Sequence, residues 1–199
     1  TKFGKTESGT IWLDPNRTSP YAFYQFWLNS ADADVYKFLR YFTFLPVADI
    51  ADIERADAER EGRPEAQSIL AREVTQLVHG EAGLMAAQRI TDALFSGDTS
   101  QLSADDLKQL ALDGLPSTSI DLANLPPTLT QLLTDAGMVS SGKQVKDALG
   151  RAAVLINGQA ISAEQNADPA SCFDPAQAMH KRFWLVRLGK KKYHLFELA

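Results

Sequence analysis

Five residues near the start of the sequence, Lys2-Phe3-Gly4-Lys5-Thr6, have the types and spacing needed to bind a phosphate group. Two lysines separated by a glycine can place two ammonium groups on one compact polyanion, because glycine adopts backbone angles that other residues resist. Short Lys/Gly stretches are more often solvated loops, so this lysine loop needs support from the rest of the chain.

The best-known phosphate motif that ends in Gly-Lys-Thr is the P-loop, which opens directly into an apolar helix. Here the first glycine of that motif would lie before residue 1. The segment that follows, Glu7-Ser8-Gly9-Thr10, is a polar turn and not a helix. We therefore exclude a P-loop.

A second group of charged residues lies near the C-terminus. Residues 1–127 carry 11 Lys and Arg against 19 Asp and Glu, a net charge of −8, although the whole chain carries only −5. Residues 128–199 carry 9 against 6, a net charge of +3. This asymmetry predicts a basic module behind an acidic one. The basic run around Lys190–Lys192 is either a solvated turn or a contact to RNA.

Other residue types that support chemistry are few. Cys172 is the only cysteine, which excludes an internal disulfide and fits a reducing cytosol, so we expect a cytoplasmic protein. His180 and His194 lack the Cys/His spacing of a metal site, and no metal is expected. His79 precedes Gly80 at a predicted helix end, with no nucleophile to partner it.

The elements that must position these residues fall into two groups, and an α+β fold is expected. Turn residues between Asp14 and Pro20 indicate a first boundary. Apolar residues then recur with helical spacing, and Ser103-Ala104-Asp105-Asp106 has the form of a capping box. Helices are predicted over residues 21–28, 32–42, 49–61, 64–79, 81–95 and 107–112.

The second group follows a Pro/Ser/Thr-rich stretch over residues 113–127 that is predicted to be a linker. Two short helices are expected behind it, around Leu129–Leu133 and Val145–Leu149. Ala153–Ile156 reads as a strand, and Asn157-Gly158 is a strong turn signal. The run from Lys181 to Phe196 is typical of two strands around a basic turn.

These pieces together resemble bacterial tyrosyl-tRNA synthetases. Lys2-Phe3-Gly4-Lys5-Thr6 is similar to their mobile signature loop, and Phe23-Tyr24-Gln25-Phe26-Trp27-Leu28-Asn29 to the segment that joins their catalytic and anticodon-binding domains. Leu77-Val78-His79-Gly80-Glu81 and Ala93-Leu94-Phe95-Ser96-Gly97-Asp98 also match. The basic helix, strand, Asn-Gly turn and C-terminal hairpin resemble the S4 RNA-binding domain of that family.

The resemblance implies roles for individual residues. Lys2 and Lys5 would be catalytic, and with Thr6 they would bind the phosphates of ATP and stabilise the departing pyrophosphate. Asp32, at the start of a helix, is the candidate for reading the first anticodon base; its alternative role is to interact with the helix dipole. The implied tRNA contacts are Lys143, Lys146, Arg151, Arg182, Arg187, Lys190, Lys191 and Lys192.

The resemblance also implies an organisation. Residues 1–19 would end a class I catalytic domain, 20–112 would form a mainly α-helical anticodon-binding domain, and 128–199 a small S4-type α/β domain. The chain begins with Thr, which suggests that an upstream part is missing. The parent enzyme would be a homodimeric tyrosine-tRNA ligase that uses ATP, Mg²⁺, tyrosine and tRNA(Tyr), with no membrane partner. This part, which could be monomeric on its own, would bind tRNA without catalysing and without a bound cofactor.

Two alternatives stay open. The chain could be a free-standing RNA-binding or regulatory module that uses an S4-type domain without catalysis, although such a module has no reason to carry the lysine loop. It could also be a helical interaction protein without any RNA role, in which case the C-terminal lysines would not give salt-dependent binding to RNA.

Overall fold

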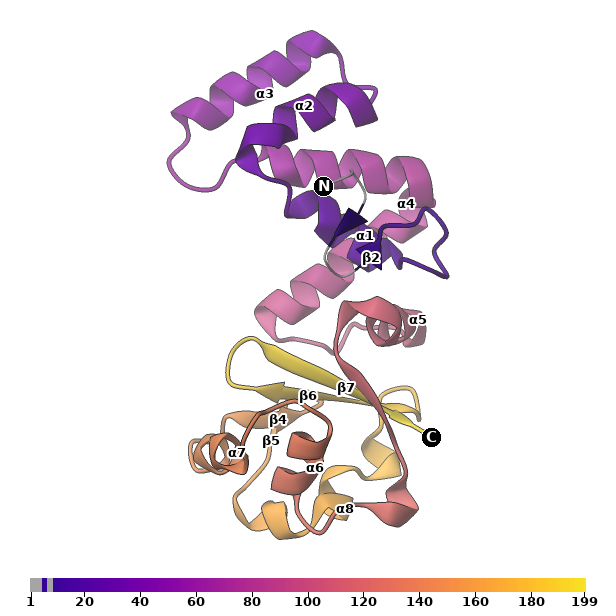
Figure 1. Cartoon of the computed structure of the whole chain (residues 1–199), viewed down its shortest axis with the longest axis vertical. Helices are drawn as coiled ribbons and strands as arrows, with labels where there is room; N and C mark the ends of the chain where they lie inside the picture. Colours follow the sequence, from indigo (N-terminus) through magenta and orange to yellow (C-terminus); the bar gives the residue numbers. More distant parts are fainter. Residues whose placement is uncertain (1–4, 7–8) are drawn as a thin grey trace. The chain divides into compact units, whose positions relative to one another are not determined.

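The computed structural model describes residues 5–6 and 9–199. The chain forms two compact units, residues 1–88 and residues 89–199, and each is described by itself (Figure 1). The first is helical apart from one short hairpin, and the second combines a five-stranded sheet with short helices. The expected α+β class is confirmed. No helix in the described part of the chain is long and apolar enough to cross a membrane.

The first unit begins with a hairpin of β1 (Lys5–Thr6) and β2 (Gly9–Thr10). The helices α1 (Pro20–Leu28), α2 (Asp32–Phe42) and α3 (Val47–Glu59) follow, and α4 (Ala66–Ser96) begins in this unit. Helix α1 starts one residue before the predicted start, because the Ser19 hydroxyl accepts a hydrogen bond from the Ala22 amide at 3.0 Å and proline suits the first helical position.

Trp27 is at the centre of the aromatic core of this unit. It is 4% exposed, and the rings of Phe23, Phe38 and Phe42 lie around it at centroid distances of 6.1, 6.1 and 5.1 Å. Tilted and edge-to-face contacts of this kind stabilise beyond the burial of apolar area alone. The sequence of residues 21–28 is apolar nearly all round because this helix packs against other elements of the core on several sides.

A buried carboxylate fixes the start of α4. Asp57, 8% exposed, accepts hydrogen bonds from the Tyr36 hydroxyl at 3.0 Å and from the amides of Glu65 at 2.7 Å and Ala66 at 3.0 Å. Burial acts to raise the pKa of Asp57, but these hydrogen bonds and nearby Arg60 outweigh it and lower the pKa. Burial and the bond to Asp57 raise the pKa of Tyr36 to about 12.

Helix α4 contains one non-helical residue, Gly80, with φ 69° and ψ −179°. The sequence predicts two helices that meet at this glycine, and the structure agrees, because two helical stretches join there at a kink. Glycine is suited to the position because its φ lies where a side chain would be strained. Gly97, with φ 84°, follows the last residue of α4.

The second unit contains the end of α4, α5 (Ala104–Gln109) and a π-helical turn at Leu110–Gly114, followed by a mixed sheet with short helices. The sheet has the strand order β3-β7-β6-β4-β5, with β3 and β7 parallel and the other neighbours antiparallel. Its strands are β3 (Ser117–Ile120), β4 (Val154–Ile156), β5 (Gln159–Ala160), β6 (Phe183–Leu188) and β7 (Lys192–Leu198). The helices are α6 (Leu129–Asp135), α7 (Gly142–Leu149) and α8 (Pro169–Cys172), with 3₁₀ turns at Leu122–Asn124, Glu164–Ala167 and Pro175–Gln177.

The segment predicted to be a linker, residues 113–127, contains β3 and is therefore part of the sheet. Thr118 pairs in register with Phe196, and the Ala199 amide donates to the Ile120 carbonyl at 3.0 Å. The sequence does not predict this strand, because the segment is rich in proline and serine and Ile120 is the only large apolar residue that the strand buries. The structural division at residues 88 and 89 also differs from the predicted domain limits of 112 and 128.

Both faces of the β6–β7 hairpin are covered. Trp184, Val186 and Phe196 belong to a core that they share with residues of α6 and α7. Residues on the opposite face alternate with these, and among them Tyr193 donates its hydroxyl to the Leu94 carbonyl of α4 at 3.1 Å. The hairpin is thus held between the last turns of α4 and the pair α6 and α7.

Candidate functional site

Two of the predicted basic segments meet at one end of the second unit. The Gly189 amide, in the turn between β6 and β7, donates to the Ala153 carbonyl at 2.8 Å. Ala153 follows α7 and precedes β4, so Arg151 and Lys190 lie on neighbouring stretches of backbone. Helix α7 and the hairpin turn are visible on the same side of this unit in Figure 1.

Helix α7 presents its charged side to solvent because its apolar side is used by the core. Val145 and Ala148 are buried at 0% and 2% exposure, whereas Lys143 and Lys146 are exposed. Arg151, after the helix, donates from Nε to the Asp147 carbonyl at 3.1 Å and is itself exposed. The amphipathic pattern alone predicts this arrangement.

The hairpin turn displays three consecutive cations. Gly189 has φ 66°, which suits glycine in a tight turn, and Lys190, Lys191 and Lys192 are all exposed. Within residues 9–199, no carboxylate lies within 4.0 Å of the ammonium groups of these three lysines or of those on α7. We call Lys143, Lys146, Arg151 and Lys190–Lys192 the basic surface.

Two of the predicted tRNA contacts lie apart from the basic surface. Arg182, at the other end of the hairpin, forms an ion pair with Glu197 at 2.6 Å, which neutralises its charge. Arg187 is half-buried, and its guanidinium lies against Gly97 at the C-terminus of α4. A cation is favourable there because it faces the negative end of the helix dipole. The sequence gives no sign of either contact.

Asp32 is exposed at the first position of α2 in the other unit. Its Oδ1 accepts a hydrogen bond from the Nε2 of Gln67 at 2.5 Å, and the Gln67 side chain also reaches the Ser30 carbonyl at 3.5 Å. Gln67 is 3% exposed, so a buried amide orients the carboxylate. The structure therefore places Asp32 where a ligand can reach it, in a fixed orientation.

The lysine loop is only partly within the described residues. Lys2 lies outside them, and of Lys5 and Thr6 only the backbone is described, as strand β1 paired with Thr10 and Gly9. The proposed contacts of these three residues with ATP stay predictions.

Neither the cysteine nor a set of potential metal ligands forms a further reactive site. Cys172 is 4% exposed, and its pKa is raised by burial, which keeps the thiol protonated. Among the described residues, no group of three or more His, Cys, Asp or Glu side chains is arranged to hold a metal ion.

Comparison with known proteins matches two successive parts of the chain to two family models. Residues 1–96 match a family model described as tRNA synthetases class I (W and Y). Residues 106–196 match one described as tyrosine-tRNA ligase SYY-like C-terminal domain. The chain belongs to the tyrosyl-tRNA synthetase family.

Curated members of the family are similar over nearly the whole chain. The tyrosine-tRNA ligase of Aliivibrio fischeri is 53% identical over 196 residues, which are 98% of this chain and 44% of the relative. That of Dechloromonas aromatica is 51% identical over 195 residues, 98% of this chain and 44% of the relative. The chain spans less than half the length of these relatives.

A solved structure of the same family is also similar. The C-terminally truncated mitochondrial tyrosyl-tRNA synthetase of Aspergillus nidulans is 37% identical, with a TM-score of 0.41, over 45% of this chain and 25% of that one.

Proposed function

We propose that this chain supplies the tRNA-binding surfaces of a tyrosine-tRNA ligase. The whole enzyme would activate tyrosine with ATP and Mg²⁺ and transfer it to tRNA(Tyr), and it would act as a homodimer. The relatives that are about half identical to the chain carry the name tyrosine-tRNA ligase, which supports this assignment. The observation that carries the tRNA-binding role is the basic surface.

Six cationic side chains gather there on a protein whose net charge is −5. Exposed cations without nearby carboxylates are free to replace the counterions of a nucleic-acid backbone, and the release of those counterions drives binding. In contrast, four arginines elsewhere in the chain each form an ion pair with a carboxylate of their own unit: Arg40, Arg55, Arg60 and Arg89. We assign residues 128–199, within the second unit, as an S4-type RNA-binding domain that contacts phosphates through α7 and the hairpin turn.

A sharp test compares two lysines of the same unit. Lys190 is on the basic surface, whereas Lys108 is 61% exposed and pairs with Asp105 at 2.9 Å. Lys190→Gln should weaken tRNA(Tyr) binding severalfold in a fluorescence anisotropy titration at 50 mM salt, while Lys108→Gln should leave it unchanged. Equal affinities for the two variants and the parent chain would count against the assignment.

Asp32 is proposed to read the first anticodon base from the helical unit. Gln67 holds Oδ1, and Oδ2 is left to accept from the Watson-Crick edge of a guanine, whose N–H groups are donors. Asp34 is also exposed in the first turn of α2 and makes a matched control. Asp32→Ala should weaken binding of tRNA with guanine at that position, and Asp34→Ala should not; the reverse order of effects would remove Asp32 as the reader.

The lysine loop is proposed to act only in the whole enzyme. Lys2, Lys5 and Thr6 would bind the phosphates of ATP and stabilise pyrophosphate as it leaves. Residues 1–199 alone should bind tRNA without forming the adenylate, and no cofactor is expected to stay bound. Pyrophosphate exchange catalysed by these 199 residues would refute that part of the proposal.

A further inference from the structure

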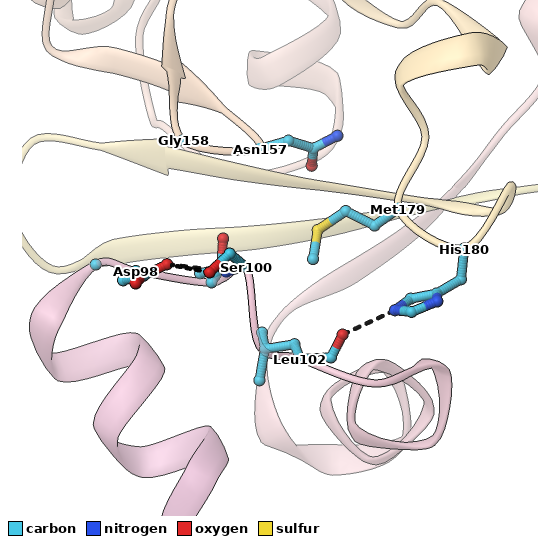
Figure 2. Close-up of a pocket in the computed structure, with 9 residues that line it drawn as sticks. Asp98, Ser100, Leu102, Asn157, Gly158, Met179 and His180 are labelled. Carbon is cyan, nitrogen blue, oxygen red and sulfur yellow. Dashed lines mark hydrogen bonds between the residues drawn. The ribbon is translucent and has the colours of Figure 1, made fainter.

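Strands β4 and β5 are joined by a turn of two residues, Asn157 and Gly158. Their φ values are 49° and 82°, and a positive φ at both positions is characteristic of two-residue hairpin turns. Gly158 is exposed, so water reaches the turn. The turn borders a pocket of about 480 Å³ that is lined as well by residues within 97–102, Met179 and His180 (Figure 2).

The side-chain amide of Asn157 is held from two directions. Its Oδ1 accepts a hydrogen bond from the Leu185 amide of β6 at 2.8 Å, and its Nδ2 donates to the Gln177 carbonyl at 2.8 Å. The backbone amide of Asn157 also donates to the Leu185 carbonyl, at 2.9 Å. One residue therefore ties the turn to β6 and to the segment before it, and the plane of its side-chain amide is fixed.

An asparagine that precedes glycine is especially prone to deamidation, because glycine has no side chain to hinder attack by its own backbone nitrogen. In that reaction the Gly158 nitrogen forms a bond to Cγ of Asn157, the Cγ–Nδ2 bond breaks, and the proton of the Gly158 amide leaves with Nδ2 as ammonia. Water then opens the five-membered imide at either of its two carbonyls, which gives aspartate or isoaspartate. The reaction consumes only water.

We propose that Asn157 is a deamidation site that the folded unit protects, so that the reaction proceeds only when the turn opens. A nucleophile attacks an amide carbon from above or below the amide plane. The rotation that presents this face of Cγ to the Gly158 nitrogen breaks both side-chain hydrogen bonds. It leaves the Leu185 amide and the Gln177 carbonyl without these partners, which costs free energy.

The products of the reaction do not fit the closed turn. Aspartate cannot donate to the Gln177 carbonyl, and its second carboxylate oxygen would face that carbonyl with like polarity. Isoaspartate adds a methylene group to the main chain of a turn that spans only two residues. Each opening of the turn thus exposes the chain to a change that is not reversed when the turn closes. This property of the second unit is independent of any RNA contact.

Mass spectrometry measures the reaction directly, because replacing the amide with a carboxyl group changes the mass of the peptide. The chain is incubated at neutral pH in buffer and, in parallel, in guanidinium chloride, and the tryptic peptide of residues 152–181 is followed with time. Asn166 lies in the same peptide before an alanine and is the internal reference. Deamidation of Asn157 should be at least about tenfold slower in the folded chain. Equal rates would overturn the inference. A faster reaction in the folded chain would also overturn it, because the Leu185 amide would then act as an oxyanion donor.

Two variants test the effect of the product. Asn157→Asp should lower the midpoint of urea unfolding without a change in slope, followed through the methyl resonance of Met138 in the core of this unit. Asn166→Asp is the matched control. Oδ1 of Asn166 accepts from the amide and hydroxyl of Thr130 at 2.9 and 2.7 Å, and its Nδ2 has no partner among the described residues, so aspartate keeps both bonds. Equal midpoints for the two variants would show that the bond to Gln177 does not hold the turn, and would overturn the inference.

Discussion

Asp106 anchors the second unit and allows a quantitative prediction. Its carboxylate is 1% exposed and accepts from Nε and Nη2 of Arg89 at 2.7 and 2.8 Å and from the Ser103 amide at 2.8 Å. The Ser103 hydroxyl in turn accepts from the Asp106 amide, which completes the capping box of α5. The one carboxylate thus joins the end of α4 to the start of α5.

Asp106→Asn should destabilise this unit by about 2–3 kcal/mol. Removing one partner from a buried ion pair costs roughly 3–5 kcal/mol, because the other charge is left without compensation. The side chain of Arg89 is 37% exposed, so water can solvate part of its guanidinium and the cost falls to the lower limit of that range or slightly below it. The amide of asparagine would also point N–H groups at a donor, so the substitution cannot restore both bonds.

The measurement is a urea titration followed through the methyl resonance of Met138, which is 2% exposed in the core of the same unit. The midpoint should fall without a change in slope. Asp105→Asn is the control, because Asp105 is 84% exposed and should change the free energy of unfolding by less than about 0.5 kcal/mol. A loss below that value for Asp106→Asn would refute the reasoning.

Two further predictions concern the same unit and the same assay. Gly97→Ala should destabilise it by about 1–2 kcal/mol, because alanine is strained at φ 84°, whereas the Arg187 guanidinium, at the end of a flexible side chain, can move away from the new Cβ. The cost should therefore be nearly the same in an Arg187→Ala background, and a cost that disappears there would contradict the strain. Burial lowers the pKa of His194, so below the unfolded pKa of about 6.5 the unfolded state binds more protons than the folded state. Stability should therefore decrease as the pH is lowered below about 6.5, by at most about 1.4 kcal/mol per pH unit for this group. His194→Gln should flatten that dependence, and an unchanged profile would assign it to other groups.

Local signals in the sequence predict much of the architecture. The capping box at Ser103, the Asn157-Gly158 turn and the amphipathic helix that carries Lys143 and Lys146 are all found in the structure. Each of these features depends on residues that are close together in the chain, so the spacing and types of those residues are sufficient to predict it. The exposure of Lys190–Lys192 is predictable for the same reason.

Features that depend on distant contacts could not be predicted. Strand β3 is stable because it pairs with β7, whose residues lie 78 positions further along the chain, and its own Pro/Ser/Thr-rich sequence is typical of a loop. Arg182 and Arg187 look equivalent to the lysines of the turn, yet one pairs with Glu197 and the other lies against Gly97. Sequence also gives no indication of the pocket between residues 97–102 and Met179.

The salt dependence of tRNA(Tyr) binding tests the central claim most directly. The logarithm of the association constant should fall linearly with the logarithm of the salt concentration, with a slope of roughly 0.7–0.9 for each phosphate that is neutralised. Replacing Lys190, Lys191 and Lys192 with glutamine should reduce that slope by about two to three and weaken binding at low salt. A slope and an affinity that do not change would contradict the assignment of the basic surface to RNA.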